Sequence, residues 1–199
     1  MRSDTISRAI DVFGSIAGLV VASPLIAAAA LAIKISDYGP VLYKQERIGQ
    51  GGRPFTILKL RTMTVGAENK GLGLLIDKND FRITIPGKIL RASSIDELPQ
   101  LLNVLRGDMS LVGPRPTVAS QVERYSPEQR RRLEVKPGLT GWAQINGRNT
   151  LSWPERIQLD LWYVDNRSLW LDLAILARTP RSLLSVREVY AQEGGTTGL

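Results

Sequence analysis

An uncharged run of 22 residues near the N-terminus, Val12 to Ile33 (VFGSIAGLVVASPLIAAAALAI), constrains the possible folds of this chain more than any other feature. A bilayer-spanning helix needs about 20 apolar residues, so the run is long enough to enter a membrane. A cleaved signal peptide fits less well, because the apolar run is too long and only a weak cleavage site follows it. The sequence therefore predicts membrane attachment, with a simple single-span anchor as the plainest form.

Three details of the run favour a helix that enters the membrane and returns to the same face. Ser23 and Pro24 lie in its middle, where proline removes a helix hydrogen bond and costs about 3 kcal/mol. Each half then has about 11 residues and spans roughly 16 Å, less than the ~30 Å hydrocarbon core. Asp11, near Arg8, suits a helix end that rests at the interface. Basic residues also flank both ends of the run, namely Arg2, Arg8, Lys34, Lys44 and Arg47.

The charge and the missing residue types limit the possible chemistry. The chain has 26 Lys and Arg against 19 Asp and Glu, and its net charge of +7 indicates phosphorylated substrates, an acidic membrane surface or nucleic acid as partner. Nucleic acid is disfavoured, because the basic stretch EQRRRLEVK has no aromatic residue on which bases could stack. Without cysteine or histidine, catalysis must use carboxylates, Lys, Arg, Tyr, hydroxyls or a cation bound by oxygen.

The expected fold is α+β and mainly helical. It comprises a re-entrant membrane helix in 1–36, broken at Ser23-Pro24, and a small cytoplasmic-face catalytic domain in 37–199. The expected elements of this domain are a short β-hairpin in 39–63, helices at 98–107, 126–138 and 152–166, a hairpin or shaped loop at 139–149, and an amphipathic helix at 168–190. This last helix suits a membrane interface or a core equally well. Residues 65–88 are rich in Gly and charge and predict a mobile segment.

The second strand of the expected hairpin carries two cations on one face. In the alternating pattern of a strand, Lys59 and Arg61 point to the same side as Ile57. Such a face binds phosphate or is solvated at a sheet edge. The strand alone favours the solvated edge.

Asp96 and Glu97 form an acid pair in a basic setting, within SSIDELPQLLNVLRGDMSLVGPRP. Ser94 and Glu97 match the S-x-x-E capping box, which is the simplest explanation. Pro99 weighs against it, because as the fifth helical residue its ring would clash with a preceding carbonyl. With Asp96 as the N-cap, Pro99 takes a position whose amide needs no intrahelical partner. In both frames Asp96 lies at the positive end of a helix, which favours a carboxylate and a phosphate alike.

An ionised carboxylate at a phosphate site requires either a mediating cation or an attack on phosphorus. Aspartate is a nucleophile in aspartyl-phosphate chemistry, and Glu97 offers oxygen ligands for Mg²⁺. Arg115, between Pro114 and Pro116, has a restricted backbone and a planar fork that suits phosphate oxygens. A rigid turn with a solvated arginine explains the same residues without chemistry. The pattern leaves phosphoryl transfer and plain anion binding both open.

Four segments in order resemble those of the bacterial sugar transferases. They are FTILKLRTM, LRASSIDELPQLLNVLRGDMSLVGPRP, VKPGLTGWAQINGRN and LDLWYVDN, and they follow the apolar start with its Ser-Pro. The resemblance covers nearly the whole chain and is to the monotopic polyprenyl-phosphate phosphoglycosyl transferases. The short length and the C-terminal EGGTTGL are most similar to the small members that start bacterial N-linked glycan assembly with diacetylbacillosamine phosphate.

The resemblance implies an enzyme in the bacterial inner (cytoplasmic) membrane, monotopic, with its active site facing the cytoplasm. Asp96 would attack the β-phosphate of a UDP-sugar, release UMP, and pass the covalent sugar-phosphate to a polyprenyl phosphate such as undecaprenyl phosphate. Asp96 and Glu97 would hold Mg²⁺. Membrane phospholipids are expected partners, because a basic body favours acidic headgroups. The positions that match phosphate- and substrate-binding residues of the family are Arg91, Arg115, Lys59, Arg61 and Asp160.

Two other functions stay open on the sequence. One is a membrane-anchored anion-binding module without catalysis, and the other is a one-step transfer that releases no UMP until the lipid acceptor is bound. The resemblance implies a 2-acetamido sugar of the diacetylbacillosamine, GalNAc or GlcNAc type. The sequence does not identify the sugar, the polyprenol length or the oligomeric state.

Overall fold

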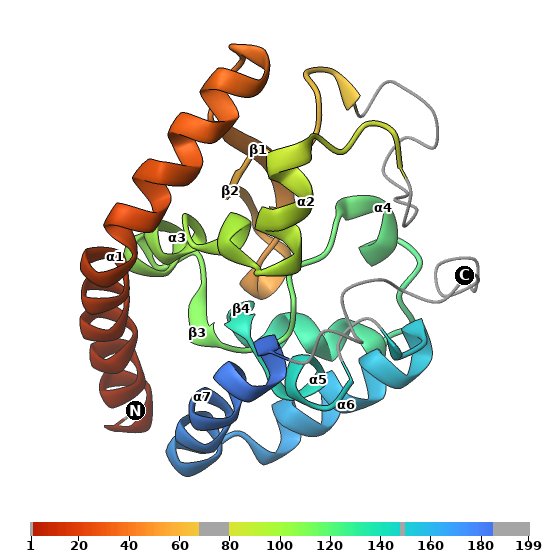
Figure 1. The fold of residues 1–199 in the computed structure, drawn as a ribbon. Coiled ribbons are helices and arrows are strands. Elements are labelled where there is room, and N and C mark those ends of the chain that lie inside the picture. Colours follow the sequence, from red (N-terminus) through yellow and green to blue (C-terminus); the bar gives the residue numbers. More distant parts are fainter. Residues whose placement is uncertain (1, 68–79, 148–149, 185–199) are drawn as a thin grey trace.

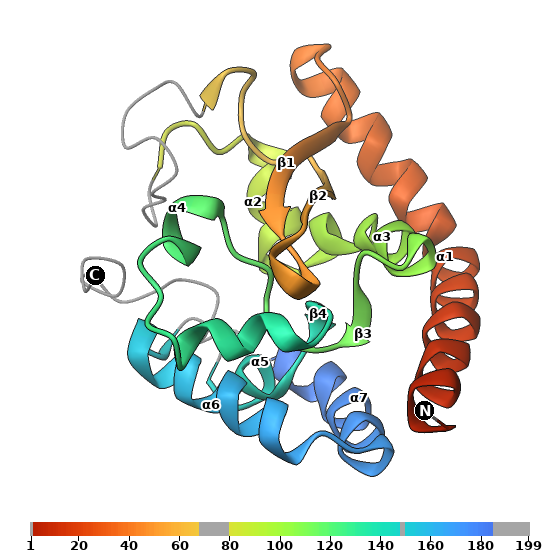
Figure 2. The same ribbon diagram turned by 180° about the vertical axis from the view of Figure 1, so that it is seen from behind.

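A single long helix, α1 (Arg2–Asp37), runs along one side of a body of short helices and strands in the computed structural model (Figures 1 and 2). The structure describes residues 2–67, 80–147 and 150–184. Pro24 lies inside α1, and the helix bends part-way along its length, as proline within a helix commonly causes. The predicted break at Ser23-Pro24 is therefore a bend within one continuous helix. This helix ends one residue beyond the predicted boundary of 1–36.

The two faces of α1 have different surroundings. On the inner face, Ala29 and Ile33 are buried against Leu60 and Leu90 of the body. None of the described residues covers the outer face, and its most exposed large side chains are Phe13, Val20, Val21, Leu31 and Ile35, each at least 62% exposed. The segment Thr5–Asp37 contains an 18-residue window with a mean hydropathy of 2.4 and is long enough to cross a membrane. Its length and bare apolar face support the prediction that this helix attaches the chain to a membrane.

Both ends of the apolar segment are bonded to the same body. Near its start, Arg8 donates to two carbonyls at the end of α3 (Gln100–Arg106) at 2.6 and 2.8 Å. The buried Asp11 accepts from the first residues of β3 (Ser110–Val112) at 2.8 and 2.9 Å. At the other end, Arg61 donates to Asp37 at 2.8 Å. Both side chains therefore hold α1 to the body, and the expectation that this helix end rests at the membrane interface stays a prediction.

Four short strands in the described part of the chain form two pairs. The predicted hairpin is confirmed, with β1 (Leu42–Ile48) antiparallel to β2 (Pro54–Leu60) around the turn η1 (Gln50–Gly52). The sequence did not predict the parallel pair of β3 with β4 (Gly138–Thr140). Strand β2 lies against protein on both sides, so the side chains of Lys59 and Arg61 are only 20% and 7% exposed. The solvated-edge explanation of these two cations is wrong.

Local sequence signals set several of the helix ends. Gly107 stops α3 with a φ of 90°, which favours glycine. Ser152 and Glu155 form a capping box at the start of the predicted 152–166 helix. The prediction of an α+β, mainly helical fold is confirmed. The remaining helical elements are α2 (Ile85–Ala92), η3 (Ile95–Glu97), α4 (Ala119–Val122), η4 (Gln129–Glu134), α5 (Trp142–Ile145), α6 (Trp153–Asn166) and α7 (Leu169–Leu184).

The amphipathic helix at the C-terminal end serves as a core helix on one side. Ile175 of α7 is fully buried with Val112, Val135 and Tyr163, while Trp170 is 81% exposed. Figure 2 shows α7 beside α6, below the strand pairs. Contact of its outer face with a membrane stays a prediction, which the exposure of Trp170 allows. Residues 185–190 of the predicted helix lie outside the described residues.

Three predicted segments differ from the structure. The polar helix at 126–138 is only the 3₁₀ turn η4, and its Arg132 is buried. In the described part of 139–149 a short helix, α5, precedes Gly147, so the shaped loop holds and the hairpin does not. Residues 68–79 of the predicted mobile segment lie outside the described residues. Asp80 and Arg82 form a buried ion pair and α2 begins at Ile85, so the prediction is wrong for 80–88.

Candidate active site

Asp96 and Glu97 lie on the short turn η3, between α2 and α3. Ser94 turns the chain at φ 56° and makes no side-chain cap, and the side chain of Glu97 points to residues far away in the sequence. The capping-box explanation is therefore wrong. Pro99 immediately precedes α3, so its missing N–H costs no helix hydrogen bond. Asp96 is not the N-cap of α3 but lies in the turn just before it.

Two cations hold the carboxylate of Glu97. Lys59 on β2 donates to it at 2.9 Å, and Arg115 grips it with two nitrogens, at 2.5 and 3.3 Å. Although burial opposes ionisation, Arg115 and Lys59 together keep the pKa of Glu97 well below its usual range. Glu97 is thus a fixed negative charge that orients both cations. Such a two-nitrogen contact is directional, which a lysine in place of Arg115 would not reproduce.

The carboxylate of Asp96 is in a different state from that of its neighbour. It is 8% exposed, and among the described residues no group donates a hydrogen bond to it. Burial, then repulsion from Glu97, raises the pKa of Asp96 to about 6, against the attraction of Lys59, Arg91 and Arg115. The group is therefore mostly ionised near neutral pH. Without donors its oxygens are available to bind a metal ion or attack an electrophile.

Further cations surround this pair. Arg91 on α2 donates from Nε to the hydroxyl of Thr62 at 2.8 Å. Burial, then repulsion from Arg115, lowers the pKa of Arg47 on β1 to about 10 and also lowers that of Arg156 on α6. The site therefore has more positive than negative charge and favours an incoming anion. Sequence reasoning missed Arg47 and Arg156, because no local pattern shows that β1 and α6 approach Arg115.

Among the predicted site residues, Arg61 and Asp160 have their partners outside the site. Arg61 points to Asp37 at the end of α1, where it anchors that helix. Asp160 on α6 is fully buried and accepts from Arg132 at 2.5 Å. The structure thus brings Lys59 and Arg115 to the dyad, with Arg91 close enough to act on Asp96 through its charge. Contacts of Arg61 and Asp160 with a substrate stay predictions.

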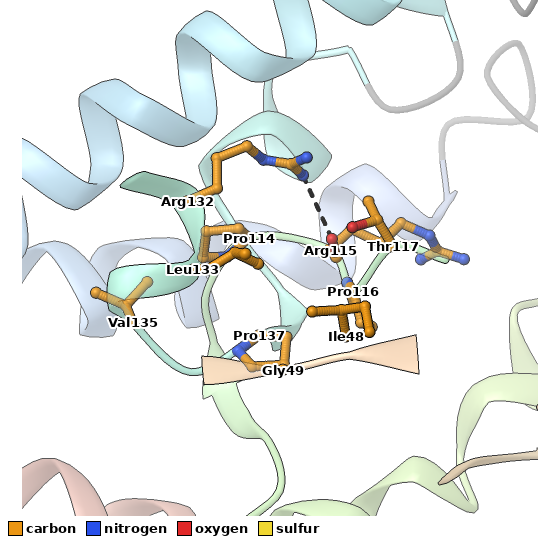
Figure 3. A pocket seen from close by; sticks show the side chains of 10 residues that line it. All are labelled: Ile48, Gly49, Pro114, Arg115, Pro116, Thr117, Arg132, Leu133, Val135 and Pro137. Carbon is orange, nitrogen blue, oxygen red and sulfur yellow. Dashed lines mark hydrogen bonds between the residues drawn. The ribbon is translucent and has the colours of Figure 1, made fainter. Parts of the chain in front are cut away.

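The turn that carries Arg115 borders a small cavity (Figure 3). Its volume of about 10 Å³ holds about one water molecule, far too little for a nucleotide. The guanidinium of Arg115 points away from the apolar wall that includes Leu133 and Val135. The Arg115 side chain is 41% exposed, so its outer face rather than this cavity is where a larger anion can bind.

The acid pair also fits a magnesium ion. In the part of the chain that the structure describes, no three His, Cys, Asp or Glu side chains gather as a possible metal site, so this site offers two carboxylates at most. Mg²⁺ commonly uses one or two carboxylates and completes its octahedron with water and substrate phosphates. The acid pair can supply such ligands, because Asp96 has no hydrogen-bond donor among the described residues and lies beside Glu97, which is already paired with cations. Asp96 is the primary candidate ligand and Glu97 the secondary one.

Nearly the whole sequence matches one protein family. The family model described as bacterial sugar transferase matches residues 2–186. The chain belongs to the bacterial sugar transferase family, which confirms the resemblance found in its motifs and the prediction that it is a transferase enzyme.

Individual relatives are similar over most of this chain. It is 48% identical to the uncharacterized sugar transferase EpsL of Bacillus subtilis, over 95% of this chain and 89% of that protein. It is 46% identical to the UDP-glucose:undecaprenyl-phosphate glucose-1-phosphate transferase of Caulobacter vibrioides, over 94% and 73%. It is 41% identical to an undecaprenyl-phosphate N-acetylgalactosaminephosphotransferase of Aeromonas hydrophila, over 90% of this chain but only 44% of that longer protein.

Proposed function

We propose that this protein transfers a sugar-1-phosphate from a UDP-sugar to a polyprenyl phosphate, through a covalent sugar-phosphate on Asp96. The observation that carries this proposal is the carboxylate of Asp96, which has no hydrogen-bond donor among the described residues and lies among Lys59, Arg91 and Arg115. Relatives named for transfer of glucose, galactose or N-acetylgalactosamine phosphate to undecaprenyl phosphate support the substrate classes. We predict a 2-acetamido sugar for this chain.

The proposed reaction has two displacements at one phosphorus atom. A carboxylate oxygen of Asp96 forms a bond to the β-phosphorus of the UDP-sugar, the bridging P–O bond breaks, and UMP leaves with its electron pair. A phosphate oxygen of the polyprenyl phosphate then attacks the same phosphorus and displaces Asp96 as a carboxylate. Each step joins only two reactants, so soluble donor and lipid acceptor never need to bind together.

Neighbouring residues make an attack by one anion on another feasible. Arg115 and Lys59, oriented by Glu97, lie where they can neutralise phosphate oxygens, and Arg91 adds a third positive charge. Magnesium, when bound at Asp96 and Glu97, would supply further neutralisation of the diphosphate. The protein residues bind and orient the phosphate, and Asp96 provides the nucleophile.

Removal of divalent metal ions tests the magnesium part of the proposal. With excess EDTA we expect UMP release to fall at least ~100-fold, since a metal ion typically contributes several kcal/mol to charge stabilisation. Added Mg²⁺ should restore the rate, while circular dichroism should show the same helix content throughout. Full activity in EDTA after exhaustive dialysis would show that the acid pair works without metal.

We also propose that α1 is re-entrant, so that the active site faces the cytoplasm at the inner membrane. The support is that Arg8, Asp11 and Asp37, at the two ends of the apolar segment, all bond to one body. A straight spanning helix would carry one of these ends to the opposite surface. The bend near the middle of α1 leaves its two ends on the side of the body (Figure 1).

The absence of cysteine from the chain makes this topology easy to test. Single variants Ser3→Cys and Ser36→Cys place a thiol at either end of α1. A membrane-impermeant maleimide should label both variants in inside-out vesicles and neither in intact spheroplasts, with detergent-solubilised protein as the control for reactivity. Labelling of one of the two in spheroplasts would establish a single-span anchor instead.

A further inference from the structure

The turn Pro114–Thr117 is held by hydrogen bonds on four consecutive carbonyls, each from a different donor. Backbone N–H groups of Gly138 and Ile48 donate to the carbonyls of Pro114 and Thr117, both at 2.9 Å. The two carbonyls between them take guanidinium donors instead. Arg132 donates to the carbonyl of Arg115 at 3.3 Å (dashed in Figure 3), and Arg47 donates to that of Pro116 at 3.4 Å.

The two prolines limit how this turn can be fixed. Pro114 and Pro116 have no backbone N–H, so the turn can be fixed through its carbonyls but not by donors at those positions. Between them Arg115 extends a long side chain, 41% exposed, to grip Glu97. Four rotatable bonds separate this guanidinium from its backbone, so a shift of the turn moves it with respect to Glu97.

Arg132 is itself held by several buried partners, although its Nε has no hydrogen-bond partner in the described part of the chain. It is 3% exposed, and it donates to Asp160 at 2.5 Å and to the hydroxyl of Tyr125. Its guanidinium also lies 5.5 Å from the ring centres of Tyr125 and Trp153. A buried ion pair is seldom more stabilising than apolar side chains of the same volume. Stability alone therefore does not account for this arrangement.

We propose that Arg132, held by Asp160, and Arg47 are positioning residues: they fix the Pro114–Pro116 turn so that Arg115 meets Glu97 and the substrate phosphate. This inference rests on the proposed function and assigns Asp160 a role through Arg132 and Arg115. A catalytic group misplaced by about 1 Å costs on the order of 10²-fold in rate. We expect a loss of that size when the turn is released.

The test separates positioning from folding by pre-steady-state UMP release. The double variant Arg132→Met/Asp160→Leu replaces the buried pair with apolar side chains and is expected to fold. Its burst amplitude, which counts competent enzyme, should match wild type, while its burst rate should fall ~100-fold. Arg47 is partly exposed, and Arg47→Gln should lower the burst rate in the same way. As a control, Asp165→Asn removes the charge of an exposed ion pair on the same helix as Asp160 and should keep the wild-type rate.

A second comparison checks that the effect acts through Arg115. In an Arg115→Ala background the same double variant should cause little further slowing, because the group being positioned is gone. A wild-type burst rate in both Arg132→Met/Asp160→Leu and Arg47→Gln, or full additivity with Arg115→Ala, would overturn the positioning role alone. A wild-type enzyme that releases no UMP, with or without acceptor, would overturn this inference together with the proposed function.

Discussion

Replacement of Asp96 by asparagine is expected to reduce sugar-phosphate transfer by at least ~10³-fold, the scale seen when a nucleophile is removed from a covalent enzyme. The amide matches the carboxylate in shape but neither attacks phosphorus nor carries charge. The variant should remain folded, because among the described residues no hydrogen bond to Asp96 is lost. The measurement is UMP release with donor, Mg²⁺ and polyprenyl phosphate.

The matched control for this variant is Asp165→Asn. Asp165 is about half exposed and pairs with Arg131 on the surface of α6, away from the acid pair. Its replacement removes the same charge and should leave the rate within about two-fold of wild type, as is usual for exposed pairs. Activity in Asp96→Asn above a few per cent of wild type would contradict the assignment of Asp96 as nucleophile.

The largest expected effect on stability is that of Asp160→Ala. It leaves Arg132 buried without its carboxylate, and breaking a buried ion pair in this way typically costs about 3–5 kcal/mol. The free energy of unfolding can be measured by urea denaturation of the protein in detergent micelles. Asp165→Ala on the same helix is the control, and loss of its exposed pair should cost at most about 1 kcal/mol.

The combined change Arg132→Met/Asp160→Leu should recover most of the stability that Asp160→Ala loses, because apolar side chains replace both charges. If Asp160→Ala is as stable as wild type, water reaches the buried pair and screens the charge of Arg132. A double variant as unstable as the single one would show that the hydrogen bonds of Arg132 to Tyr125 and Arg115 matter more for stability than its charge.

Local features of the fold could be predicted from the sequence, and long-range side-chain pairs could not. The stop at Gly107 and the cap at Ser152 depend on a few neighbouring residues, and both were predicted correctly. The stretch around Arg132 reads as a solvated polar helix, because its partner Asp160 lies 28 residues further along the chain. The sequence pattern of Arg8 and Asp11 likewise gives no indication that they bond to residues about 100 positions away.

For the candidate site too, local conflicts in the sequence were informative and long-range partners were not. The conflict between Pro99 and a capping box correctly indicated that Glu97 has another use, and the structure pairs it with Lys59 and Arg115. Arg61 shares a strand face with Lys59, yet the end of α1 supplies Asp37 as its partner. The packing of α1, which is distant in the sequence, thus decides that Lys59 and not Arg61 reaches the site. No local pattern in the strand shows this.

The measurement that tests the central claim most directly is UMP release without lipid acceptor, followed by the intact mass of the protein. The enzyme is mixed with Mg²⁺ and a panel of UDP-sugars that includes UDP-glucose, UDP-galactose and the 2-acetamido donors. A covalent intermediate predicts a burst of about one UMP per enzyme. It also predicts a sugar-phosphate adduct whose mass identifies the sugar, and which is absent in Asp96→Asn. UMP release only after polyprenyl phosphate is added, with no adduct at any time, would contradict covalent catalysis and establish a one-step transfer.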